Sequence, residues 1–149
     1  MRSAVISLAH GLTGAALGVM LRHPAAALLA GVISHIPLDE TPHRDYRTAL
    51  AAIVDLVATA AVLAMACIYL HRRQRAELVL PLLLGAVGGI LPDLEVAIGY
   101  FYHQRLFFPT HTGLLPHPQL QSGNLGIWTQ VVVILLDLLC LGVATAAPR

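Results

Sequence analysis

Two long apolar segments constrain the fold of this chain more than any other feature. Residues 48–70 and 125–147 are each 23 residues long and predominantly apolar, and a helix needs about 20 such residues to cross a membrane. Hydrophobic residues make up 57% of the chain and charged residues only 11%, whereas soluble domains carry roughly 25% charged residues. We therefore predict a single all-α domain over residues 1–149, an integral membrane helical bundle.

Shorter apolar segments supply the partners of these two helices. They cover residues 4–21, 25–38 and 78–92. Proline marks their ends: Pro37 and Pro42 bracket the end of the second helix, and Pro92 ends the fourth, because proline has no N–H for the helix ladder. Residues 103–124 hold three prolines and two glycines, which predicts a polar loop. The expected architecture is a bundle of four to five helices.

Small residues recur at four-residue spacing in these segments, as Gly14 and Gly18, Ala27 and Gly31, and Gly85 and Gly89. This spacing lets membrane helices approach closely. A polar residue continues each stripe on the same helix face, four positions before its first small residue or four after its last. These polar residues, together with Asp55 of the third helix, are His10, His35, Asp39 and Asp93. We expect all of them to face helix–helix contacts.

If consecutive helices are antiparallel, the same polar residues gather at one end of the bundle. Ionisable groups at membrane depth cost of order 3 kcal/mol each, so such a cluster needs a neutralising partner. Histidine nitrogen and aspartate oxygen without thiolate suit zinc, manganese or iron. Shared protons, or pairing of aspartate with Arg44 or Arg47, is the alternative that the sequence leaves open.

Three short motifs carry a resemblance to a known family. SHIPLDETPH at residues 34–43, ILPDLE at 90–95 and PTHTG at 109–113 resemble signatures of bacterial membrane-bound metal-dependent hydrolases, distant relatives of zinc-dependent phospholipase C. The resemblance covers roughly residues 7–113. It implies that metal is bound by His10, Asp93, His111, and by His35 with Asp39. The SHxxxD element here precedes LPD instead of following it, an expected HR pair is missing, and Thr112 replaces a serine.

The sequence therefore predicts a membrane-embedded metal-dependent hydrolase that holds one or two divalent ions, with zinc favoured. An uncoordinated carboxylate, Glu40 or Glu95, is the expected general base. A lipid phosphoester substrate is implied by the resemblance alone. The expected metal ligands are His10, His35, Asp39, His43, Asp55, Asp93 and His111.

Two other functions use the same residues: a carrier or channel for metal ions or protons, and a non-catalytic membrane scaffold. A net charge of +1 without any lysine argues against a nucleic-acid partner, which needs clustered positive charge. The expected partners are membrane lipids.

The basic residues predict an orientation. Residues 71–75 form the densest basic loop, and Arg22 lies on the same side of an antiparallel bundle. The positive-inside rule places that side in the cytoplasm. In the bacterial inner membrane implied by the resemblance, the polar cluster would then face outward.

Overall fold

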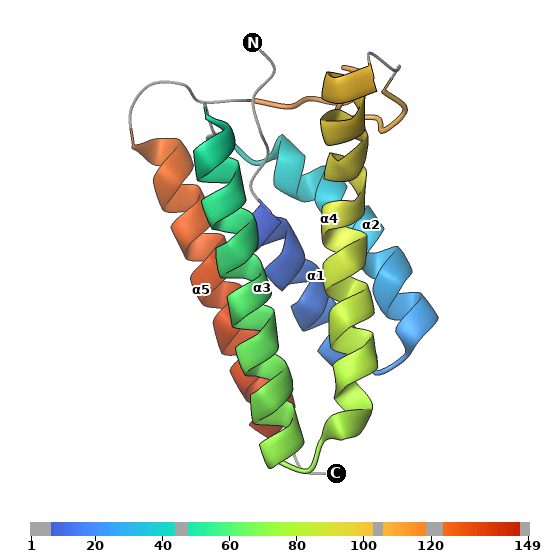
Figure 1. The fold of residues 1–149 in the computed structure, drawn as a ribbon, viewed down its shortest axis with the longest axis vertical. Helices are drawn as coiled ribbons and strands as arrows, with labels where there is room; N and C mark the ends of the chain where they lie inside the picture. The colour runs from blue at the N-terminus through green and yellow to red at the C-terminus, as the bar shows by residue number, and fades with distance from the viewer. Residues whose placement is uncertain (1–6, 44–47, 103–105, 119–123, 147–149) are drawn as a thin grey trace.

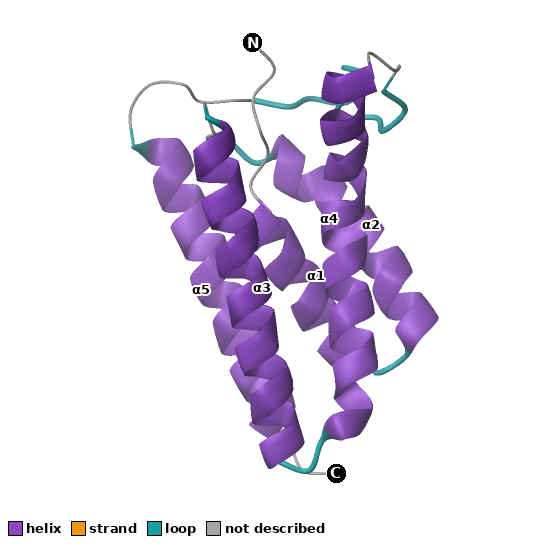
Figure 2. Cartoon of the chain, in the orientation of Figure 1, coloured by secondary structure: helices purple, strands orange, loops and turns teal. Residues whose placement is uncertain are grey.

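Five α-helices make up the part of the chain that the computed structural model describes, residues 7–43, 48–102, 106–118 and 124–146 (Figure 1). The all-α bundle predicted from the sequence is confirmed. The helices, joined by loops and by one short 3₁₀ turn at Ala76–Leu78 (Figure 2), are α1 (Ser7–Leu21), α2 (Pro24–Glu40), α3 (Ala49–Arg72), α4 (Val79–Tyr102) and α5 (Leu125–Ala146).

Three segments of the described chain are long and apolar enough to cross a membrane: Leu50–Arg72, Ala76–Val96 and Leu125–Ala146. Large apolar side chains on α3 and α5 point outward, among them Val57, which is 63% exposed, and Val143, which is 64% exposed. Water is a poor solvent for such faces, whereas lipid tails are not. These helices support membrane association.

α1 lies at the centre of the bundle and contacts each of the other four helices, while α2 packs on α1 and α4. The predicted small-residue stripes make these contacts. A Cβ atom added at Gly14 would overlap the carbonyl oxygen of Gly85, and one at Gly18 would overlap that of Pro81. Gly31 of α2 likewise lies against Gly85. The helix backbones touch directly, as they do where small residues line membrane helix contacts.

One proline prediction is confirmed and one is wrong. Helix α2 continues through Pro37 and ends at Glu40, between Pro37 and Pro42 as expected, whereas α4 continues through Pro92 to Tyr102. A proline removes only its own N–H from the ladder, and packing against neighbouring helices keeps the helix intact in membrane bundles. The continuation of α4 carries Glu95 on the same helix as Asp93. It also places the following loop directly above the polar cluster.

The two ends of the bundle differ. The start of α1, the end of α2 and the start of α5 lie toward the end with the longer loop segments (Figure 2). The short α1–α2 and α3–α4 connections form the opposite end (Figure 1). There Arg75 is buried, donates to the carbonyl oxygen of Thr145 in the last turn of α5, and pairs with Glu77. A cation at a helix C-terminus is favourable, so Arg75 anchors α5.

Candidate metal centre

Five side chains from three helices and one loop meet inside the bundle. The cluster consists of His10 from α1, His35 and Asp39 from α2, Asp93 from α4 and His111 from the loop after α4. Their exposed fractions are low: Asp39 and His35 are both 0% exposed, and Asp93 is 9% exposed. The structure therefore brings together four of the five helix residues that the small-residue stripes predicted, and adds His111 of the PTHTG motif.

Four of the nitrogen and oxygen atoms form a closed ring. His35 Nε2 lies 3.4 Å from Asp39 Oδ2 and 3.2 Å from Asp93 Oδ1. His111 Nε2 lies 3.4 Å from the same Asp39 oxygen and 3.8 Å from the same Asp93 oxygen. His10 Nε2 approaches the other oxygen of Asp39, Oδ1, at 3.6 Å.

These spacings discriminate between two kinds of contact. A hydrogen bond between charged imidazole and carboxylate has a length of about 2.7–2.9 Å. Ligands bound to one tetrahedral ion at about 2.0–2.2 Å lie about 3.3–3.6 Å from each other. The four contacts of the ring range from 3.2 to 3.8 Å. All four are longer than a strong hydrogen bond, and the two contacts of Asp39, at 3.4 Å, fall within the spacing of ligands on one ion.

The missing hydrogen bonds inside the cluster also favour a bound cation. Six buried side-chain nitrogen and oxygen atoms of the described residues lack a hydrogen-bond partner, and every one belongs to this cluster: His10 Nδ1, His35 Nε2, Asp39 Oδ1, both oxygens of Asp93 and His111 Nε2. An unsatisfied buried polar group costs about 1–3 kcal/mol, more when it is charged. Three of these atoms, His35 Nε2, Asp93 Oδ1 and His111 Nε2, belong to the ring, and a cation within the ring would satisfy them together.

The outer ring nitrogens of two histidines are fixed. His35 Nδ1 lies 2.7 Å from the carbonyl oxygen of Gly89, which can only accept, so Nδ1 carries the proton and donates it. His111 Nδ1 lies 3.0 Å from Glu95 Oε1. In both residues Nε2 therefore faces the centre of the cluster, the arrangement typical of metal-binding histidines. Burial lowers the pKa of His111, but the nearby carboxylates of Asp39 and Glu95 outweigh this and raise the pKa above its ordinary value.

Glu95 holds the loop over the cluster. Its carboxylate accepts hydrogen bonds from the backbone N–H groups of Phe107 and Phe108 and also contacts His111. Thr110 of the same loop donates to Asp39 Oδ2. With these donors in place, Glu95 is suited to orient His111 and the loop. Glu40, the other predicted general base, lies at the exposed end of α2.

Asp55 lies outside the cluster. Its Oδ2 atom accepts from the backbone N–H groups of Ser7 at 2.6 Å and Leu8 at 3.1 Å. These are the first N–H groups of α1, which have no partner within the helix, and negative charge is favourable at that end. Asp55 thus caps α1 from α3, a structural role that the sequence prediction of a metal ligand did not foresee.

Two further histidines lie beside the cluster. His43, a predicted ligand, and His117 of the loop have their Nε2 atoms 3.0 Å apart, and together with Asp39 they form a third group that could hold a metal ion. His117 is absent from the ligands predicted from the sequence, because only its position next to His43 in the fold signals a role. His103, Arg44 and Arg47 lie outside the described residues.

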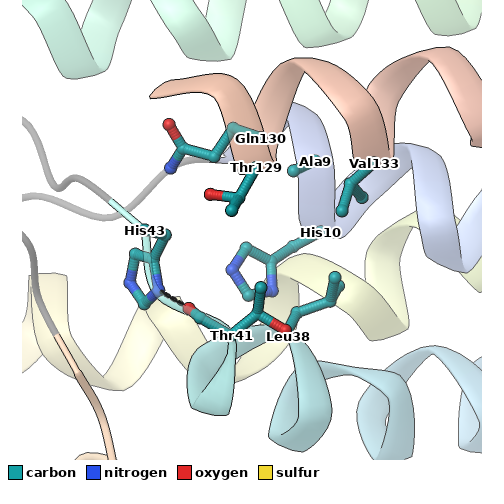
Figure 3. Close-up of a pocket in the computed structure, with 8 residues that line it drawn as sticks. All are labelled: Ala9, His10, Leu38, Thr41, His43, Thr129, Gln130 and Val133. Carbon is teal, nitrogen blue, oxygen red and sulfur yellow. Dashed lines mark hydrogen bonds between the residues drawn. The ribbon is translucent and has the colours of Figure 1, made fainter. Parts of the chain in front are cut away.

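A small cavity of about 20 Å³ adjoins the cluster, which is room for one water molecule. Figure 3 shows His10 and His43 on its wall, with Thr41 below and Thr129 and Gln130 of α5 above. The lining mixes imidazole, hydroxyl and amide groups with the apolar side chains of Ala9, Leu38 and Val133. The cavity places a water-sized space next to the histidines.

Comparison of the chain with protein-family models, with curated proteins and with solved structures gives no match.

Proposed function

We propose that this protein is a membrane-embedded metal-dependent hydrolase. The observation that carries the proposal is the convergence of unpartnered buried His and Asp atoms at the mutual spacing of metal ligands. His35, Asp39, Asp93 and His111 would hold the ion, with zinc favoured for a set of two imidazoles and two carboxylates. Zinc is bound by imidazole and carboxylate ligands without needing thiolate.

A divalent ion that takes a water molecule as a fifth ligand would lower the pKa of that water to near 7 and so supply a nucleophile. The residues of this chain position that chemistry. Glu95 and Gly89 orient His111 and His35, Thr110 fixes Asp39, and the cavity beside His10 offers room for water. Hydrolysis of an ester then forms one bond from the water oxygen, breaks the ester bond and returns a proton to the leaving alcohol.

The carrier function is less well supported. A conduction path needs polar groups through the depth of the bundle, but the core beyond the cluster is filled by apolar residues such as Leu12, Val19 and Leu82, each at most 1% exposed. Close backbone contacts between α1 and α4 fill the same region. On α5, the buried side chain of Asp137 accepts a hydrogen bond from Thr13. The cluster is a one-sided pocket.

The resemblance to the membrane-bound hydrolase family and to zinc-dependent phospholipase C supports a phosphoester as the substrate, with lipid headgroups the class within reach of an interfacial site. The test uses detergent-purified protein loaded with zinc, with bis(p-nitrophenyl) phosphate and phosphatidylglycerol vesicles as probes. We expect hydrolysis of at least one probe, lost on chelation and restored by zinc. Failure of fully metal-loaded protein to cleave either probe would remove the phosphoester assignment.

We also propose that the site faces outward from the cytoplasmic membrane. Exposed Arg22, Arg72 and Arg73 lie at the end opposite the cluster, and the positive-inside rule places them in the cytoplasm. Reporter fusions after Arg75 and after Arg47 should give cytoplasmic and external signals, respectively. The reverse pattern would invert the orientation.

A further inference from the structure

The loop that covers the cluster carries large apolar side chains on its outer side. Residues 106–118 contain no Asp, Glu, Lys or Arg. Phe107 is 81% exposed and Leu114 is 78% exposed, which makes them the two most exposed large apolar side chains of the described residues. Loops that face water are normally polar. This loop therefore presents a surface that is suited to an apolar partner.

Glu95 fixes the two neighbouring phenylalanines in different surroundings. Its carboxylate accepts from the backbone N–H of Phe107 at 2.9 Å and from that of Phe108 at 2.7 Å. The ring of Phe108 packs inward, with its centroid 5.1 Å from that of His35 and 5.4 Å from that of His111. The side chain of Phe107 is turned outward. One carboxylate thus holds both the inner side of the loop, which closes the cluster, and the outer apolar side.

Glu95 also sets the depth of the loop. The candidate membrane span Ala76–Val96 ends directly after it, and the exposed apolar side chains of α4 continue up to Leu94. Phe107, held by Glu95, therefore lies at the level where this helix leaves the hydrocarbon. Exposed Trp128, in the first turn of α5, lies toward the same end of the bundle (Figure 1). Aromatic side chains are enriched at this level of membrane proteins.

The backbone of the loop is hydrogen-bonded within the protein. The N–H groups of residues 112–115 donate to the carbonyl oxygens of Phe108, Pro109 and Thr110, and Glu95 accepts the two N–H groups at the start of the loop. Non-helical backbone is tolerated at membrane depth only where the protein satisfies its polar groups. The loop meets this condition, so contact with lipid leaves these N–H groups paired.

We propose that the loop of residues 106–115 lies on the bilayer surface and that Phe107 and Leu114 insert between the lipid headgroups and the upper acyl chains. Phe, Leu and Trp are the side chains by which interfacial segments enter this layer. Lipid is favoured over a second copy of the chain because the loop lies at the boundary of a span that the bilayer already surrounds. The inference goes beyond the proposed function and needs neither a metal ion nor hydrolysis.

The test is tryptophan fluorescence of the full chain in phosphatidylcholine–phosphatidylglycerol vesicles, with and without bromine on the acyl chains. The single tryptophan is removed by Trp128→Phe, and Phe107→Trp or Leu114→Trp is added to that background. Arg73→Trp, at an exposed position in the turn after α3 and beyond its span, is the matched control. We expect acyl bromine to remove most of the fluorescence of both loop variants and little of the control, and aqueous iodide to do the reverse.

The two quenchers separate the possible surroundings of the loop. Quenching of both loop variants by iodide and not by bromine would place the loop in water and overturn the proposal. Protection from both quenchers would indicate cover by protein, such as a second copy, and would overturn it as well. Trp128 of the wild type is the reference for quenching by lipid. A finding that the protein binds no metal would remove the proposed function without changing this result.

Discussion

Asp93→Asn tests the metal centre with the least change in shape. Asp93 Oδ1 lies 3.2 Å from His35 Nε2, and neither oxygen of Asp93 has a hydrogen-bond partner. The substitution keeps the volume of the side chain but removes the negative charge that a cation needs. Removing a residue that only supports a ligand typically costs 10–100-fold in metal affinity, so we take about 100-fold as the smallest loss for a ligand itself.

The size of the expected shift in melting temperature follows from the coupling of metal binding to folding. Metal at 100 times its dissociation constant stabilises the folded wild type by about 2.7 kcal/mol. After a 100-fold loss of affinity, the same concentration stabilises Asp93→Asn by only about 0.4 kcal/mol. For a protein of this size one kcal/mol moves the melting temperature by about 2–4 °C. Zinc should therefore raise the melting temperature by about 5–11 °C in the wild type and by about 1–2 °C in the variant.

The assay is thermal unfolding in detergent, followed by the fluorescence of the single tryptophan, with zinc and with chelator. Asp137→Asn is the matched control, because Asp137 is also 9% exposed but hydrogen-bonds with Thr13 outside the cluster. It should keep the full zinc-dependent shift. Without metal, Asp93→Asn should melt no lower than the wild type, since it removes a buried charge without a partner. An equal zinc-dependent shift in wild type and Asp93→Asn would refute the assignment of Asp93.

Three further substitutions test the packing and the supports of the site. Gly85→Ala should lower the melting temperature, because its Cβ would overlap the backbone of Gly14 and overpacking costs about 1–3 kcal/mol. Gly142→Ala, where the added Cβ would meet nothing within 4 Å, should leave the melting temperature unchanged. An equal loss in both variants would contradict close packing at Gly85. Asp55→Ala should destabilise the protein by about 1 kcal/mol, the cost of losing a helix cap, yet retain bound zinc; loss of zinc would return Asp55 to the ligand set. Glu95→Gln should weaken zinc binding about 10–100-fold, as expected for a group that orients a ligand. Competition with a chelator measures this affinity, and an unchanged affinity would show that His111 needs no support from Glu95.

The sequence was sufficient to predict those residues of the metal centre whose position depends on one helix face alone. His35 and Asp39 are four residues apart, and both continue the face that begins at Gly31, so the same spacing that indicated close packing placed them together. Asp93 followed from Gly85 and Gly89 in the same way. These predictions needed only the helical period.

The remaining features depend on contacts between segments far apart in the chain. Asp55 has the same local pattern as a seam residue, but its role follows from the start of α1 lying beside it, 47 and 48 residues away in sequence. His117 joins His43 across 74 residues. The length of α4 was underestimated because helix packing compensates for the missing N–H of Pro92, a tertiary effect that local proline rules do not contain.

The metal content of the wild-type protein tests the central claim most directly. The protein is purified in detergent without chelator, freed of loosely bound ions and measured by elemental analysis, then measured again after equilibration with zinc. The unpartnered ligand atoms of His35, Asp39, Asp93 and His111 predict at least one tightly bound equivalent of a transition metal, with zinc restored after chelation. Protein that is correctly folded, carries no metal and takes up none on addition of zinc would contradict the account.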